Sequence, residues 1–153
     1  MRLGNVGTIA LLGTAGVLLL AQFVPVQTTN PPATRDVSAP SRIEATLRRA
    51  CYDCHSNETR WPWYSRIAPI SWRAAHEVEL GRRQINFSQW DEYYPATRKR
   101  KLQWTERALR EEKMPPWDYR LMHPGARLTE ADKAALEQWI ESALATPSAQ
   151  RSK

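Results

Sequence analysis

The sequence predicts an all-α fold, and three observations support this prediction. Apolar residues recur at intervals of three and four in several separate segments, which is the spacing of one helix face. Prolines, glycines and capping residues mark the expected ends of these segments. No segment alternates between apolar and polar residues as a half-buried strand does, and we find no internal repeat. The 153 residues are enough for one domain with appendages.

The first expected element is an uncharged, apolar helix over residues 6–24. At about 1.5 Å per residue its length would be roughly 28 Å, close to the thickness of a hydrocarbon core. Leu19 is too large for the −3 position of a cleavage site after Ala21, which favours a retained anchor over a cleaved signal peptide. We therefore expect residues 1–24 to be a signal or transmembrane anchor. A retained anchor would be a single pass through a bacterial inner membrane, with the domain facing the periplasm; a cleaved one would leave a secreted periplasmic protein.

Residues 25–40 contain four prolines among small polar residues, which is typical of a disordered or polyproline-like linker. The globular domain is expected at residues 41–146 and a disordered tail at residues 147–153. A loop broken by two prolines is expected at residues 56–69. The expected helices of the domain cover residues 42–54, 72–80, 89–94, 97–113 and 129–146.

Capping residues define several of these helix ends. Ser41 and Glu44 match a capping box at the start of the first domain helix. Thr129 and Asp132 give the last helix a similar start. Gly81 is expected to adopt the left-handed conformation that ends the second domain helix.

Cys51, Cys54 and His55 spell the pattern CxxCH, and the chain has no other cysteine. The pattern is typical of covalent attachment of a c-type haem, with the histidine as proximal iron ligand. On a helix the two cysteines would lie on one face, roughly 5–6 Å apart, which suits the two vinyl groups of one porphyrin. A redox dithiol would need a βαβ context, a zinc site a second ligand pair, and a stabilising disulfide a longer loop. We therefore expect one covalent haem c, with its iron, as the cofactor.

The residue on the other side of the iron would decide the chemistry of the site. The candidates for this distal position are Met114, His76, Met122 and His123, and the position can also be vacant. Met114 is favoured because the two prolines after it stiffen the backbone, and a weak iron–thioether bond needs a rigid loop. His76 is the main alternative, although a lone histidine is more often hydrogen-bonded in place. Methionine is more often a gap-filling core residue than a ligand.

The chain resembles a known family over a wider region than this motif. The matching features are CYDCHSNETRWPWYSRIAPISW at residues 51–72, His76, Gly81-Arg82, Asn86-Phe87-Ser88, Trp90, Met114-Pro115, Tyr119, His123-Pro124, Leu128-Thr129 and Trp139. With these features, residues 41–145 resemble the bacterial haem-binding domain family of cytochrome c type. The resemblance implies a small cytochrome c-like helical domain around a single covalent haem, membrane-attached or periplasmic. It implies Cys51 and Cys54 as attachment sites, His55 as proximal ligand and Met114 as distal ligand, but no reaction.

The charge pattern bears on partners. The formal net charge is +6, and residues 97–113 hold seven basic residues against three acidic ones. This pattern suits docking of an acidic redox partner protein, although a solvated helix face has the same composition. Arg82, Arg83 or the tryptophans are expected to bind the haem propionates. The expected compartment excludes nucleic acid as a partner.

The favoured function is a one-electron carrier with His55 and Met114 as axial ligands, rather than an enzyme. The alternative is a haem-based ligand sensor or peroxidase-like enzyme with an open or displaceable distal site, in which His76 would act. A third alternative is an accessory subunit whose haem stabilises an interaction surface.

Overall fold

The structure of the protein is a computed structural model that describes residues 3–145. Within this part of the chain it contains seven α-helices, three short 3₁₀ helices and no strand, which confirms the predicted all-α fold. The expected tail at residues 147–153 lies outside the described residues.

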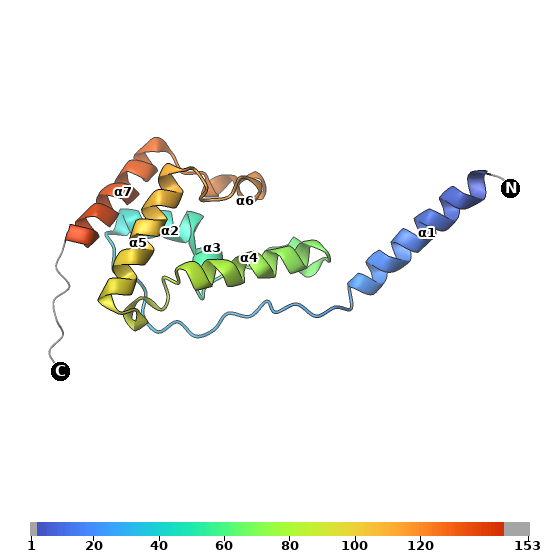
Figure 1. Cartoon of the computed structure of the whole chain (residues 1–153), viewed down its shortest axis with the longest axis horizontal. Helices are drawn as coiled ribbons and strands as arrows, with labels where there is room; N and C mark the ends of the chain where they lie inside the picture. The colour runs from blue at the N-terminus through green and yellow to red at the C-terminus, as the bar shows by residue number, and fades with distance from the viewer. Residues whose placement is uncertain (1–2, 146–153) are drawn as a thin grey trace.

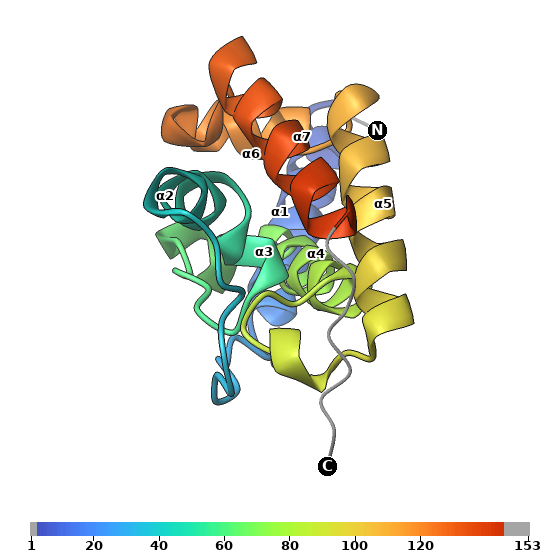
Figure 2. The same ribbon diagram turned by 90° about the vertical axis from the view of Figure 1, so that its left-hand side faces the viewer.

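The helices are labelled α1 to α7, and the 3₁₀ helices η1 to η3. Their bounds are Leu3–Ala21 for α1, Ser41–Ala50 for α2, Tyr52–His55 for α3, Trp63–Arg66 for η1, Ile70–Gln84 for α4, Trp90–Glu92 for η2, Pro95–Arg110 for α5, Trp117–Met122 for α6, Pro124–Ala126 for η3 and Glu130–Ala145 for α7. Figure 1 shows that α1 stands apart while the other helices pack together. In Figure 2, α5 and α7 lie side by side, and α3 packs on α4. The sequence did not predict η1, α6 or η3.

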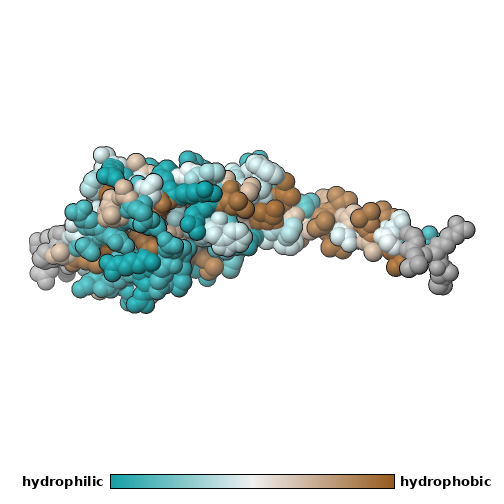
Figure 3. Space-filling view, turned by 90° about the horizontal axis from the view of Figure 1, so that it is seen from above, coloured by the Kyte–Doolittle hydropathy of each residue, from teal (hydrophilic) through white to brown (hydrophobic). Residues whose placement is uncertain are grey.

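Helix α1 has a mostly apolar surface (Figure 3) and ends at Ala21. The side chain of Gln22 there pairs with both backbone groups of Ala68, at 3.2 Å from Nε2 to O and 3.0 Å from N to Oε1. None of the helices described here is long and apolar enough to cross a membrane. The predicted single-pass anchor in a bacterial inner membrane, with the domain facing the periplasm, is therefore wrong.

Residues 29–37 of the expected linker lie extended against the domain. The backbone N–H of Val37 donates to the carbonyl oxygen of Phe87 at 3.0 Å. Arg35 forms an isolated parallel bridge with Gln89. Val37 is buried, so this proline-rich segment contributes a side chain to the core.

The first domain helix is interrupted at Cys51. Its φ of −124° and ψ of −35° separate α2 from the single turn of α3, so the continuous helix predicted over residues 42–54 is wrong. The predicted capping box is also absent, because Ser41 is already the first helical residue and Pro40 occupies the N-cap, with no side-chain cap hydrogen bond. Glu44 instead accepts a hydrogen bond from Arg48 on the helix surface, Nε to Oε1 at 2.9 Å.

The second predicted capping box is confirmed. The backbone N–H of Thr129 donates to Asp132 Oδ2 at 3.0 Å, and the backbone N–H of Asp132 donates to Thr129 Oγ1 at 3.1 Å. Both contacts join residues three positions apart, so the sequence could nominate them without any tertiary information.

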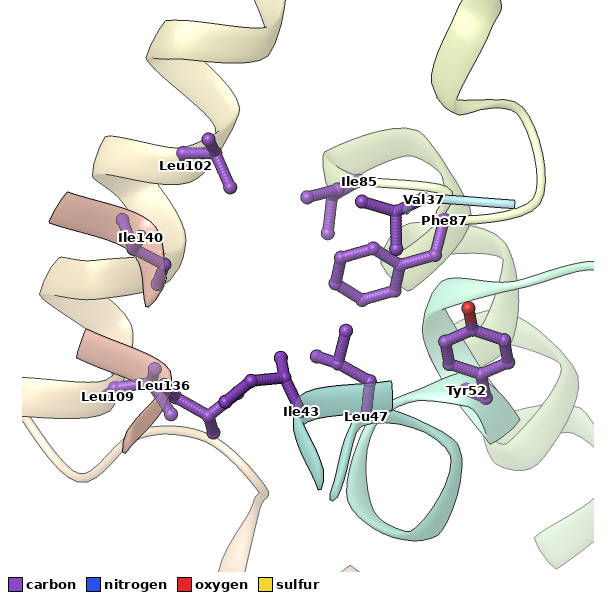
Figure 4. Close-up of a cluster of buried hydrophobic side chains, with 10 residues drawn as sticks. All are labelled: Val37, Ile43, Leu47, Tyr52, Ile85, Phe87, Leu102, Leu109, Leu136 and Ile140. Carbon is purple, nitrogen blue, oxygen red and sulfur yellow. The ribbon is translucent and has the colours of Figure 1, made fainter. Parts of the chain in front are cut away.

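The core is one cluster of ten buried hydrophobic side chains, drawn in Figure 4. Ile85 and Phe87 follow α4 and stand opposite Leu102 of α5 and Ile140 of α7. Phe87 stacks on Tyr52, with 5.6 Å between ring centroids. The cluster therefore joins the CxxCH region to the two C-terminal helices.

Candidate functional site

Cys51, Cys54 and His55 lie on the turn that links α2 to α3. The backbone N–H groups of Cys54 and His55 both donate to the carbonyl oxygen of Cys51, at 3.2 and 2.9 Å. Cys51 itself donates to Leu47 O at 2.8 Å. The hydrogen-bonded turn thus continues through the break at Cys51 and keeps both thiols on one short, rigid segment.

Two backbone carbonyl groups orient the ring of His55. Its Nδ1 lies 2.9 Å from Gly81 O and 3.2 Å from Ile85 O. A carbonyl oxygen only accepts hydrogen bonds, so Nδ1 carries the proton and Nε2 keeps its lone pair. Burial lowers the pKa of His55, which favours the neutral ring. His55 therefore has the tautomer that binds a metal through Nε2.

Gly81 allows α4 to approach the CxxCH turn closely. The helix continues through Gly81 to Gln84, and no described glycine has a positive φ, so the predicted left-handed helix end is wrong. A Cβ atom at this position would clash with the carbonyl oxygen of Cys54 and would lie 2.9 Å from its carbonyl carbon. Glycine is required here by the packing of two helices, which a single sequence does not display.

The two thiols are free and partly buried. Burial raises the pKa of Cys51 and of Cys54 to about 12. A redox dithiol or a zinc ligand acts as a thiolate, so these pKa values disfavour both alternatives. Across residues 3–145, no group of three or more histidine, cysteine and acidic side chains is arranged to hold a metal ion.

A cavity of about 260 Å³ opens beside the CxxCH turn. Cys51, Cys54, His55 and Met114 all line it, although Met114 is 59 residues from the end of the motif in sequence. The remaining lining is mostly apolar and comes from α2, residues 84–87, α5, residues 115–119 and α7. In Figure 4 the labelled side chains of α5 and α7 stand opposite those of residues 85–87 across this region. The fold therefore brings the predicted attachment, proximal and distal residues to one cavity.

The two sides of the cavity are built differently. We call residues 47–55 and 81–87 the histidine wall, and residues 111–123 the methionine segment. The backbone hydrogen bonds of the methionine segment are local, and side chains make its contacts with distant residues: Tyr119 Oη donates to Asp53 Oδ2 at 2.7 Å, and Lys133 Nζ lies 2.7 Å from Glu112 Oε1. Tyr119 also lines the cavity.

The other three candidate distal ligands are not among the residues that line the cavity. His76 is exposed on α4, and Met122 is 53% exposed at the end of α6. His123 stacks on Tyr119 with 4.1 Å between ring centroids, and its Nε2 lies 3.3 Å from Tyr64 Oη. Of the four candidates, the fold brings only Met114 next to the cysteines.

The arginines expected to bind the propionates do not line the cavity either. Arg82 Nε donates to Ser56 O at 2.8 Å, and Arg82 Nη2 donates to Asn30 Oδ1 at 3.0 Å. Arg83 pairs with Glu79. Both guanidinium groups are thus engaged elsewhere. Of the tryptophans named in the same expectation, Trp104 and Trp139 line the cavity, and their role stays a prediction.

Two polar cavity residues, Lys101 and Tyr119, were not predicted. Lys101 shares its helix face with Trp104, Thr105 and Ala108, which also line the cavity, so the helical spacing of α5 was a usable signal. Tyr119 gave no such signal, because its contact with Asp53 spans 66 residues.

The basic helix predicted as a docking face is α5. Several of its cations are paired within the chain: Arg98 with Asp91 at 3.6 Å, and Arg110 with Glu106 at 2.7 Å. These pairs reduce the charge available to a partner, and an acidic redox partner stays a prediction.

Comparison with known proteins gives one finding. A family model described as a haem-binding domain matches residues 16–142, which is most of the chain. No curated protein and no solved structure matches.

Proposed function

The chain belongs to the haem-binding domain family, and we propose that it carries one covalently attached haem c and transfers single electrons. The observation that carries this proposal is the shared cavity of Cys51, Cys54, His55 and Met114. Its mostly apolar lining suits a porphyrin ring, and its two thiols, imidazole nitrogen and thioether are the groups that a c-type haem requires. The residues present therefore fit the cofactor.

On the histidine wall, the roles follow from position. Cys51 and Cys54 would form the two thioether bonds, and the hydrogen-bonded turn holds their sulfur atoms in place. His55 would bind iron through Nε2, because its Nδ1–H is taken by the carbonyl groups of Gly81 and Ile85. Such hydrogen bonds also raise the basicity of the ligating nitrogen.

On the other side, Met114 would be the distal ligand. Haem iron supplies a reversible one-electron change, and a thioether ligand raises its reduction potential relative to a second imidazole. The cavity lining holds no aspartate or glutamate among the described residues, and its single histidine is His55. The lining therefore offers no carboxylate, and no histidine besides the expected proximal ligand, as the acid or base for peroxide cleavage, which favours a carrier over a peroxidase-like enzyme.

Two measurements test the proposal. Protein made in a bacterial host that attaches haem covalently should gain the mass of one haem, and this gain should disappear when both cysteines are replaced by alanine. The oxidised protein should show the methionine-to-ferric charge-transfer band. Met114→Ala should abolish this band, while Met122→Ala, a matched change outside the cavity, should keep it. A wild-type protein with free thiols and no haem adduct would refute the proposal, and a band that survives Met114→Ala would refute the distal assignment.

A second candidate function is a sensor in which a small ligand displaces Met114. One observation favours it: Met114 is 41% exposed and precedes α6 in an irregular stretch. Rapid binding of carbon monoxide to the reduced wild-type protein would support a sensor. Slow binding that becomes fast in Met114→Ala would support the carrier.

A further inference from the structure

Lys101 is the one lysine or arginine among the described residues that line the cavity. It is half-buried on α5. Trp104, one turn further along α5, also lines the cavity and is 51% exposed, so the cavity reaches solvent beside Lys101. An anionic group of a cavity ligand could therefore meet both a cation and water at this end.

The ammonium group of Lys101 has no carboxylate partner within residues 3–145. Its Nζ donates to Arg83 O at 3.1 Å and to Gln84 O, both at the C-terminal end of α4, and lies 4.6 Å from the ring centroid of Tyr93. Two other cations of α5, Arg98 and Arg110, are by contrast paired with carboxylates. Burial and the neighbouring Arg100 lower the pKa of Lys101, which indicates an ammonium group without a compensating anion.

The lining also contains no acidic residue among those described. A haem has two propionate groups, and burying an unpaired carboxylate in apolar surroundings is costly. An ammonium has three N–H donors, and two of them serve the carbonyl groups of α4. Beside the ring of Tyr93, the third donor has no oxygen or nitrogen acceptor among the described residues.

We propose that Lys101 binds a haem propionate and so sets which edge of the porphyrin lies at the junction of α4 and α5. This inference rests on the proposed haem binding. It replaces Arg82 and Arg83, which the sequence suggested for this role and which are engaged elsewhere. Gln84, the last residue of α4, also lines the cavity and offers a neutral side-chain N–H donor at this junction.

The experiment compares Lys101→Gln with Lys99→Gln in haem-loaded protein. Lys99 lies on the same helix but is exposed and outside the cavity lining, so both variants lose one positive charge from α5. Resonance Raman spectra contain propionate bending bands whose frequency reports hydrogen bonding to the carboxylate. Lys101→Gln should shift one of these bands and lower the reduction potential, because an uncompensated propionate stabilises ferric iron. Lys99→Gln should leave the band in place and change the potential less.

The outcomes separate the possible roles. If Lys101 only binds the carbonyl groups at the C-terminal end of α4, Lys101→Gln will lower the free energy of unfolding without moving the propionate band. That result would overturn the proposal. If Lys101→Gln does not fold, Lys101→Arg takes its place. A guanidinium donates differently from an ammonium, so this variant should also shift the band, and an unchanged band contradicts the proposal. Absence of haem from the wild-type protein would instead refute the proposed function, which the mass measurement shows separately.

Discussion

The histidine wall and the methionine segment face the same cavity but are held in different ways. Backbone hydrogen bonds fix the histidine wall, such as Phe87 N to His55 O at 2.8 Å, and Leu47 and Phe87 there are at most 2% exposed. The backbone hydrogen bonds of the methionine segment are all local, so side-chain contacts alone tie it to distant residues, and Trp117 within it is 73% exposed. Backbone ladders in a packed core open at high free energy, whereas exposed segments with few buried contacts open at low free energy. The comparison indicates one preformed side of the site and one adjustable side.

The largest expected effect comes from truncating one aromatic residue on each side. Phe87→Ala should lower the free energy of unfolding by about 3–5 kcal/mol, because Phe87 is buried against Tyr52 and contributes to the cavity lining. Trp117→Ala should change it by no more than about 0.5 kcal/mol, because that ring is mostly in solvent. Guanidinium unfolding of the haem-loaded variants measures both values. Equal losses at the two sites would break the comparison.

A smaller effect is expected from Gly81→Ala. An added Cβ would push α4 away from the CxxCH turn and disturb the carbonyl group that orients His55, at a cost of about 3 kcal/mol. Gly125→Ala is the control, since a Cβ there meets nothing within 4 Å. At an unhindered helix position, replacing glycine by alanine stabilises the protein. A loss of stability in Gly81→Ala would therefore report the close contact with Cys54. The fraction of chain carrying haem and the unfolding midpoint are the measurements; a stabilised Gly81→Ala would show that the two helices can separate freely.

The same glycine illustrates what sequence could and could not predict. Helix periodicity and the Thr129–Asp132 capping box are local, and the structure confirms an all-α fold and that box. Gly81 looked like a helix end because a glycine after an apolar stretch usually is one. The close approach of Cys54 that requires it is a tertiary contact, 27 residues away in the chain.

The candidate site likewise has a part that local sequence predicts and a part that depends on tertiary packing. The CxxCH motif is contiguous in sequence, and Met114 is singled out by the two prolines that directly follow it. Both could therefore be predicted from sequence as haem-binding residues. The motif and Met114 line one cavity because α5 and α7 pack over the histidine wall. The spacing of apolar residues along each helix does not specify this packing. The N-terminal helix is displaced from its predicted bounds of residues 6–24: α1 covers Leu3–Ala21, and the side chain of Gln22 after it binds the backbone of Ala68, a contact between residues 46 positions apart that sequence does not display.

Tyr119→Phe should destabilise the protein less than Phe87→Ala or Gly81→Ala does, and it is the most direct test of the adjustable side. This variant removes the hydrogen bond from Tyr119 to Asp53 but keeps the ring that stacks on His123, at a cost of about 1 kcal/mol. Asp53 lies between the two cysteines, so the lost bond is a direct tie between the motif and the methionine segment. If that tie holds Met114 in place, imidazole should bind the ferric variant faster than wild type, because the segment opens more often.

Tyr64→Phe is the matched control for this variant. It removes a hydroxyl group near the same His123 ring, at 3.3 Å from Nε2, but leaves the bond to Asp53 intact. Imidazole should therefore bind Tyr64→Phe at close to the wild-type rate. Stopped-flow absorption of the ferric proteins measures these rates. Equal rates in all three proteins would mean that the contacts of Glu112 and the two prolines alone hold the segment, and the methionine segment would then be as firmly fixed as the histidine wall.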